Sequence, residues 1–286
     1  MKIAHLILAH NNPSQLESLV KRLIYKDDAV YIHLDKKTDF SQFARLASLP
    51  NVIFVKKRVK VTWGACNIVT ATINGFKEII ASGVAYDYLN LLSGADYPLQ
   101  PPAAFHQYLS AHQGKAFMSY AKMHSEWQEA LPRVEQYHLN NFKFPGRYVA
   151  QKLVNRVMPK RNVPSGLVPV GRSQWFTIPV ACVRHIVSYW QKNNRLRRFT
   201  TFTWAPDEFI FQTILYNSTH CKILVNNNLR YMDWPAGAAS PKMLSMADHE
   251  HIINSEHFFA RKFDFEKSPD LLNLLNQRLE QSANLN

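Results

Sequence analysis

The sequence predicts an α/β fold built on a central, mixed but mostly parallel sheet that is flanked by helices. Two observations carry this prediction. Short apolar runs rich in β-branched and aromatic residues alternate with helical patterns in the first third of the chain, an alternation typical of parallel strands with helical crossovers. The chain has 286 residues, is 47% hydrophobic and shows no repeat or linker. We therefore expect a single domain over residues 1–286.

The first half, residues 1–121, is expected to bind a nucleotide. Helices are predicted near 15–24 and 67–82 from their apolar periodicity. Ligands in such sheets gather at the carboxyl ends of the strands, so the polar residues after each strand are candidate contacts. Strands are predicted at KIAHLILAH (2–10), VYIHLD (30–35), NVIFV (51–55) and YDYLNLLS (86–93).

The second half, residues 122–286, is expected to bind an acceptor and to add C-terminal contacts to the donor phosphates. A helix after Pro102 and a strand at KAFMSY (115–120) lead into a polar, basic segment, 122–171, which we interpret as a long excursion over the acceptor side. Regular structure is then predicted at a strand (173–178), a helix (179–191), a helix (206–217), a strand pair (222–227 and 229–234) and a helix after Pro269.

The charge of the chain limits its partners and its compartment. A formal net charge of +13 and a pI near 9.6 indicate an anionic partner, such as nucleic acid, a membrane surface or a phosphorylated small molecule. Cys66, Cys182 and Cys221 are odd in number and lack CxxC spacing, and no signal peptide or spanning run is visible. We expect a cytoplasmic protein, and if it meets a membrane we expect peripheral contact through its basic surface.

The stretch TWAPDEFIFQTIL (203–215) holds the strongest candidates for acid–base chemistry. Pro206 favours a helix start, and acids in a first turn complement the helix dipole, so Asp207 and Glu208 are expected there. A carboxylate base suits removal of a proton from a sugar hydroxyl. The chain has no GxSxG motif and no cysteine in a reactive context, which leaves Glu208 or Asp207 as the acid or base.

The phosphate-binding candidates are side chains, because the chain has no glycine-rich phosphate loop. Lys242 and the pair Arg261-Lys262 could offset the charge of a diphosphate, although each also fits an exposed basic turn. Asp35, at a strand end, could accept hydrogen bonds from a base or ribose, or could simply cap a turn. Asp96 is the one carboxylate of SGADYPLQP (93–101), which argues against a metal site.

Several blocks resemble, in order and over nearly the whole chain, the core-2/I-branching β-1,6-N-acetylglucosaminyltransferase family, which includes peptide O-xylosyltransferases and plant glucuronosyltransferases. The resemblance implies a GT-A-like, Rossmann-like glycosyltransferase fold and inverting transfer from a UDP-sugar, without a divalent metal or another cofactor. The blocks are ILAHNNPSQLESLVKRL, YIHLDKKTD, VTWGACNIVTATINGF, YDYLNLLSGADYPLQ, GRSQWFTIP, WAPDEFIFQTIL, LRYMDW and FFARKFD.

The same resemblance implies roles for individual residues. Glu208 is the expected catalytic base. Lys262 is expected to contact the donor diphosphate, with Lys242 as a second cation, while Asp35 contacts the uridine and Trp234 stacks on the acceptor sugar. The remaining expected contacts are His10, Trp63, Gly64 and Asp96 on the donor side, and Trp175, Asp207 and Arg230 on the acceptor side.

The expected function is therefore sugar transfer from a UDP-sugar to a hydroxyl of a glycan or lipid-linked oligosaccharide. N-acetylglucosamine is the leading donor sugar, with xylose and glucuronic acid as alternatives. Animal members carry an anchor, a stem and disulfides that this chain lacks, which indicates a bacterial enzyme of surface-polysaccharide synthesis at the inner face of the plasma membrane. The rival interpretations are a non-catalytic nucleotide-sugar or glycan-binding module and a basic nucleic-acid-binding protein. The chain has no nucleic-acid recognition motif, so no nucleic-acid partner is expected.

Overall fold

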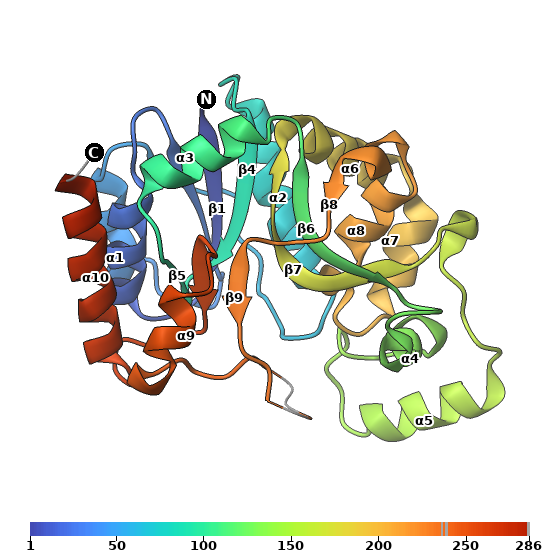
Figure 1. Ribbon diagram of the computed structural model, residues 1–286. Helices are drawn as coiled ribbons and strands as arrows, with labels where there is room; N and C mark the ends of the chain where they lie inside the picture. Colours follow the sequence, from blue (N-terminus) through green and yellow to red (C-terminus); the bar gives the residue numbers. More distant parts are fainter. Residues whose placement is uncertain (236, 238–239, 285–286) are drawn as a thin grey trace.

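The computed structural model describes residues 1–235, 237 and 240–284 and has a layered α/β architecture (Figure 1). In this described part, a seven-stranded sheet has the order β3-β2-β1-β4-β7-β6-β8. Pairing is parallel from β3 to β4 and antiparallel on both sides of β7, and β8 is parallel to β6. The predicted mixed, mostly parallel sheet is thus confirmed. Its strands are β1 (Ile3–Ala9), β2 (Ala29–Leu34), β3 (Val52–Phe54), β4 (Tyr88–Ser93), β6 (Ala116–Lys122), β7 (Val170–Pro179) and β8 (Leu224–Val225).

Helices cover both faces of this sheet, and each face has its own apolar core. Strands β1, β2 and β4 are almost wholly buried, as expected for parallel strands between two helical layers. One layer contains α1 (Pro13–Leu23), α3 (Pro102–Ala111) and α10 (Pro269–Asn284). The other contains α2 (Asn67–Ala81), α6 (Val180–Lys192), α7 (Asn194–Thr201) and α8 (Ile210–Tyr216).

A second, three-stranded sheet lies below the carboxyl end of β4. It has the order β5-β10-β9, with β5 (Asp96–Pro98), β10 (Phe259–Arg261) and β9 (Arg230–Met232). The predicted strand pair 222–227 and 229–234 is wrong, because β8 pairs with β6 and β9 pairs with β10. The chain passes between the two sheets through Leu229, which has a left-handed backbone (φ 62°), and does not reverse into a hairpin.

The predicted helix over 206–217 is also interrupted. Pro206–Glu208 forms one 3₁₀ turn, η4, and α8 begins only at Ile210. Phe209 separates them with a non-helical backbone (φ −141°, ψ −23°), and its side chain is fully buried. A Cβ placed on Gly171 would stand 2.2 Å from the Phe209 Cβ and 2.5 Å from the Glu208 carbonyl oxygen, so this tight packing holds the turn out of the helix.

The segment 122–171 contains more regular structure than its weak periodicity predicts. Short α-helices and 3₁₀ turns occur in this segment and in the other connections between strands. Helix α5 lies at the edge of the molecule, at the lower right of Figure 1. No helix in the described ranges is both long and apolar enough to cross a membrane. The remaining elements are η1 (Ser41–Ser48), η2 (Gln128–Ala130), α4 (Leu131–Glu135), α5 (Arg147–Val157), η3 (Pro164–Gly166), η5 (Thr219–Ile223), η6 (Met246–Asp248) and α9 (His249–Ile253).

Candidate functional site

A cavity of about 1160 Å³ opens at the carboxyl ends of β1, β2 and β4. The second sheet bounds it on one side, and η4 with the first half of β7 bounds it on the other. Parallel strands predict a ligand site at this edge. Ten of the predicted site residues line the cavity: His10, Asp35, Trp63, Gly64, Trp175, Asp207, Glu208, Arg230, Trp234 and Lys262.

Glu208 lies at the cavity wall with one carboxylate oxygen engaged. An N–H of Arg133 donates to Oε2, and the Glu208 side chain is 29% exposed. The Arg133 guanidinium stacks between two indoles, 4.4 Å from the Trp204 ring centroid and 4.9 Å from that of Trp127. Because Arg133 is fixed by both rings, it holds Glu208 in one orientation and leaves Oε1 for a ligand.

Asp207 is the buried member of the carboxyl pair. Its side chain lines the cavity, and its Oδ1 is buried without a hydrogen-bond partner among the described residues. Burial, together with the nearby charge of Glu208, raises the pKa of Asp207 to about 7. At neutral pH the two acids therefore carry less than two full negative charges, which is the behaviour of close carboxyls in a desolvated site.

The end of the cavity next to β1 and β2 contains His10 and Asp35, which directly follow these two strands. Asp35 Oδ1 accepts from the Lys37 backbone N–H at 2.8 Å, and Oδ2 accepts from the Val61 N–H at 3.2 Å. The residue therefore closes its own turn and also lines the cavity. Burial lowers the pKa of His10, and the charges of Lys37 and Lys262 lower it further against an opposing effect of Asp35.

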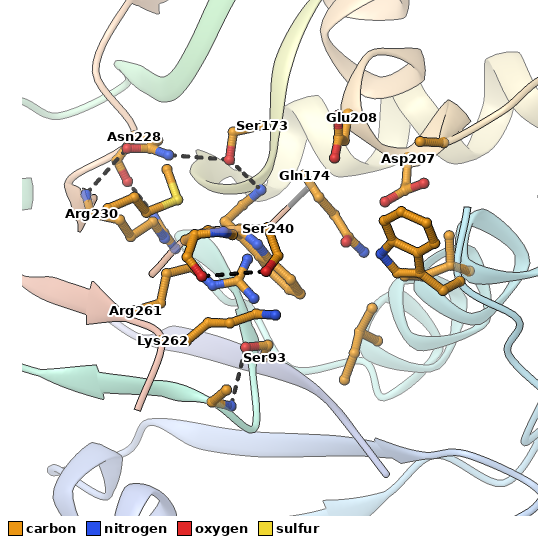
Figure 2. A pocket seen from close by; sticks show the side chains of 18 of the residues that line it. Ser93, Ser173, Gln174, Asp207, Glu208, Asn228, Arg230, Ser240, Arg261 and Lys262 are labelled. Atoms are coloured by element: carbon orange, nitrogen blue, oxygen red, sulfur yellow. Dashed lines mark hydrogen bonds between the residues drawn. The ribbon is translucent and has the colours of Figure 1, made fainter. Parts of the chain in front are cut away.

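Two cations of the cavity wall are Arg261, the last residue of β10, and Lys262, which follows it. Arg261 forms a 3.0 Å ion pair with Asp96, and its guanidinium lies 4.5 Å from the Trp175 ring centroid. Lys262 has no ion pair within the described residues, and burial followed by the charge of Arg261 lowers its pKa. Figure 2 shows Lys262 reaching into the open space, with Glu208 and Asp207 on the far side.

Two predicted donor contacts do not line this cavity. Asp96 is fully buried, and its carboxylate accepts from the N–H and hydroxyl of Ser93 at 3.0 and 2.8 Å while pairing with Arg261. It thus supports the turn after β4. Lys242 pairs with Asp248 at 2.6 Å, a hydrogen bond that raises the pKa of Lys242. The sequence could not distinguish Lys242 from Lys262, because the difference depends on this acid partner.

Arg230, a predicted acceptor contact, is engaged with the protein itself. It is buried, and its terminal N–H groups donate to Thr177, Asn90 and the carbonyls of Asn228, Leu91 and Phe176. Burial lowers the pKa of Arg230 to about 9. The guanidinium therefore crosslinks β4, β7 and β9 at the cavity wall.

Sequence reasoning missed Arg133 and the indoles of Trp127 and Trp204. The Trp204 ring packs edge-on against Trp63 with centroids 5.5 Å apart, and a Cβ on Gly64 would stand 2.6 Å from its indole nitrogen. No local motif marks Arg133 or Trp127, since Arg133 meets Glu208 across 75 positions of chain, whereas Trp204 begins the block WAPDEFIFQTIL that also contains Glu208. In the described part of the chain, no group of three or more His, Cys, Asp or Glu residues is arranged to hold a metal ion.

The chain is similar to proteins of a known enzyme family. The model of the family described as "Branch: Core-2/I-Branching enzyme" matches residues 3–259. Xylosyltransferase 2 of Homo sapiens is 26% identical over 313 residues, covering 98% of this chain and 34% of that protein. Xylosyltransferase 1 of Rattus norvegicus is 24% identical over 314 residues, with 98% and 35% coverage. The chain thus spans about a third of the length of these curated relatives.

Among solved structures, mouse xyloside xylosyltransferase 1 in its apo form is similar to this chain. It aligns with a TM-score of 0.36 and 10% identity over 79% of this chain and 84% of that one. A 4-diphosphocytidyl-2C-methyl-D-erythritol synthase aligns with a TM-score of 0.34 and 12% identity over 68% and 83%.

Proposed function

Because this chain belongs to the Core-2/I-branching enzyme family, we propose that it is an inverting, metal-independent glycosyltransferase with Glu208 as its base. The observation that carries the proposal is the placement of Glu208 and Lys262 on opposite sides of one cavity. An acid and a cation so placed suit a reaction in which one oxygen loses a proton while another gains negative charge.

The proposed reaction is a single displacement. Glu208 Oε1 takes the proton from an acceptor hydroxyl, and the hydroxyl oxygen forms a bond to the anomeric carbon of the donor. The bond from that carbon to the diphosphate oxygen breaks on the opposite side, and its electron pair leaves with UDP. Attack and departure on opposite faces invert the anomeric configuration. Positioning and base catalysis by one carboxylate supply on the order of 10²–10⁴-fold of the rate.

The leaving diphosphate is proposed to rest on side-chain cations. Lys262 has no ion pair among the described residues, and its neighbour Arg261 packs against the Trp175 ring. Two positive charges in a partly desolvated pocket can offset the charge that develops on UDP. Asp35 and His10 at the nucleotide end are the proposed uridine contacts. No metal or other cofactor is part of this proposal.

The acceptor is proposed to be a glycan or a lipid-linked oligosaccharide. Trp234, the predicted acceptor contact, lines the cavity with 49% of its surface exposed, and an exposed ring at the rim suits stacking on the face of an acceptor sugar. We place the enzyme in the cytoplasm at the inner face of a bacterial plasma membrane, in surface-polysaccharide synthesis. The curated relatives are named xylosyltransferases, so UDP-xylose joins UDP-N-acetylglucosamine and UDP-glucuronic acid as the donors to test first.

The test has a binding arm and a transfer arm. Thermal-shift screening with UDP-sugars identifies the donor, since a ligand that binds the folded state raises its apparent stability. Glu208→Gln should then abolish transfer with UDP affinity nearly unchanged. Glu129→Gln, which removes another carboxylate of the same cavity that is 72% exposed, is the matched control and should retain transfer.

Three outcomes would contradict parts of the proposal. Near-normal turnover of Glu208→Gln would remove Glu208 as the base. Loss of activity in EDTA that manganese restores would overturn metal independence. Saturable binding of a UDP-sugar without hydrolysis or transfer to any acceptor would favour the non-catalytic binding module.

A further inference from the structure

The positive charge of this chain is concentrated in one quarter of its length. Residues 136–206 contain twelve lysine and arginine residues and no aspartate or glutamate, whereas the whole chain has 34 basic and 21 acidic residues. Nearly all of the net charge of +13 therefore originates from this segment. Helices α5 and α7 belong to it, and between them they carry six of the twelve cations.

Helix α5 exposes its apolar residues and turns its amides inward. Val149, Leu153 and Val157 form a row at i, i+4 and i+8 with 72%, 61% and 70% of their surface exposed. The protein side of the helix is held by hydrogen bonds instead. Asn155 accepts from the Tyr137 N–H and donates to its carbonyl, and Gln151 accepts from the Leu139 N–H. This arrangement is the reverse of a surface helix that packs on a core.

Cations flank the aliphatic row. Lys152 and Arg156 occupy the adjacent exposed row of the same helix, next to Tyr148. Phe144 before the helix and Met158 after it extend the apolar surface, with 45% and 48% exposed. An apolar row bordered by basic side chains is the pattern of a helix that lies in the interface of a membrane, where the apolar row enters the acyl boundary and the cations meet headgroups.

We propose that α5 docks this protein onto an anionic phospholipid surface. Val149, Leu153 and Val157 insert below the headgroups, and Lys152 with Arg156 binds lipid phosphates and carboxylates. Two other occupants fit less well. A second copy of the chain would bring the same cations against one another without an intervening acid. Nucleic acid or an anionic polysaccharide would use the charge and leave the aliphatic row in water.

The segment that carries α5 connects the proposed membrane-binding surface to the cavity. The excursion that carries α5 starts at Trp127, Glu129 and Arg133, which line the cavity. A membrane bound by α5 would therefore lie at the acceptor side. This last step depends on the proposed function, whereas membrane binding itself does not and is measured without any sugar donor.

The experiment is co-sedimentation of the full chain with two kinds of vesicle. One is phosphatidylcholine alone, and the other is phosphatidylcholine with about 30% of the anionic lipid phosphatidylglycerol. We expect binding to the anionic vesicles and a decline with salt. Val149→Ser/Leu153→Ser/Val157→Ser and Lys152→Gln/Arg156→Gln should each lower the partition coefficient by at least about tenfold. Val84→Ser and Lys77→Gln/Lys115→Gln change exposed residues elsewhere and should leave it unchanged.

Each result has a defined meaning. Loss of vesicle binding in both α5 variants, with thermal stability and transfer to a soluble acceptor retained, supports the docking surface. Wild-type protein that does not bind anionic vesicles overturns it. Binding only to oligonucleotide or heparin, unaffected by the serine variant, would assign the charge to a polyanion. A dimer in light scattering that the serine variant separates would assign α5 to a second copy.

Discussion

Asp207 provides a quantitative test of the electrostatics of the cavity. Its pKa is raised from an ordinary 3.8 to about 7 because its carboxyl is buried beside Glu208. Below pH 3.8 the carboxyl is protonated in both folded and unfolded states. Between pH 3.8 and about 7 the folded state holds a proton that the unfolded state has lost, so stability falls as pH rises. Above about pH 7 the loss is complete.

The magnitude follows from the size of the shift. One pKa unit corresponds to about 1.4 kcal/mol, so a shift from 3.8 to about 7 costs about 4 kcal/mol at alkaline pH. Asn is a neutral analogue of the protonated acid. Asp207→Asn should therefore gain stability relative to the unsubstituted protein, by about 2.5 kcal/mol more at pH 8 than at pH 5. Any effect of the amide on packing is the same at both pH values and cancels.

The assay is urea denaturation of both proteins at pH 5 and pH 8, followed by tryptophan fluorescence. Glu129→Gln serves as the control for removing a carboxylate of the same cavity, because the Glu129 side chain is 72% exposed. An Asp207→Asn difference that is equal at the two pH values would refute the burial argument. A difference larger at pH 5 would require an opposite shift of the pKa of Asp207.

Three further predictions test the neighbouring structure. Gly171→Ala should destabilise the fold by roughly 3 kcal/mol in chemical denaturation, because its methyl group would clash with backbone atoms. Gly94→Ala should lower the free energy of unfolding much less, because its Cβ would lie 3.4 Å from the nearest atom, the Ala9 Cβ. Lys262→Ala should weaken UDP binding in calorimetry by about 10- to 100-fold, and Lys242→Ala by less than about threefold, since its ammonium is paired with an acid. Arg230→Lys should cost about 3 kcal/mol in denaturation, because lysine cannot serve the several buried acceptors.

The sequence could predict the strand ends because their signal is local. Apolar runs followed by polar residues placed Asp35 and His10 at the ligand edge, and the sheet order brings them together there. The same reasoning placed Asp96 close by but could not show its direction. Its carboxylate turns inward to Ser93 and Arg261, a choice made by a partner 165 positions away.

Long-range packing accounts for the features that the sequence did not predict. The sequence 206–217 is compatible with one continuous helix, and only the approach of Gly171 to Phe209 shows why the helix breaks. Helix α5 was missed although Val149, Leu153 and Val157 have the spacing of one helix face. Periodicity alone could not show that this face is exposed.

Strand β7 explains why Glu208 and the cations Arg261 and Lys262 share one cavity at a fixed spacing. It enters between β4 and β6 in the antiparallel sense, so its first half lies at the carboxyl edge of β4. Gly171 at its start packs against the turn that carries Glu208, and Trp175 four residues later packs on the Arg261 guanidinium. One rigid strand therefore supports both the proposed base and the proposed phosphate site. Because strands change length little, the separation of the two groups is set by the sheet, and the loops around the cavity can vary with the acceptor without altering it.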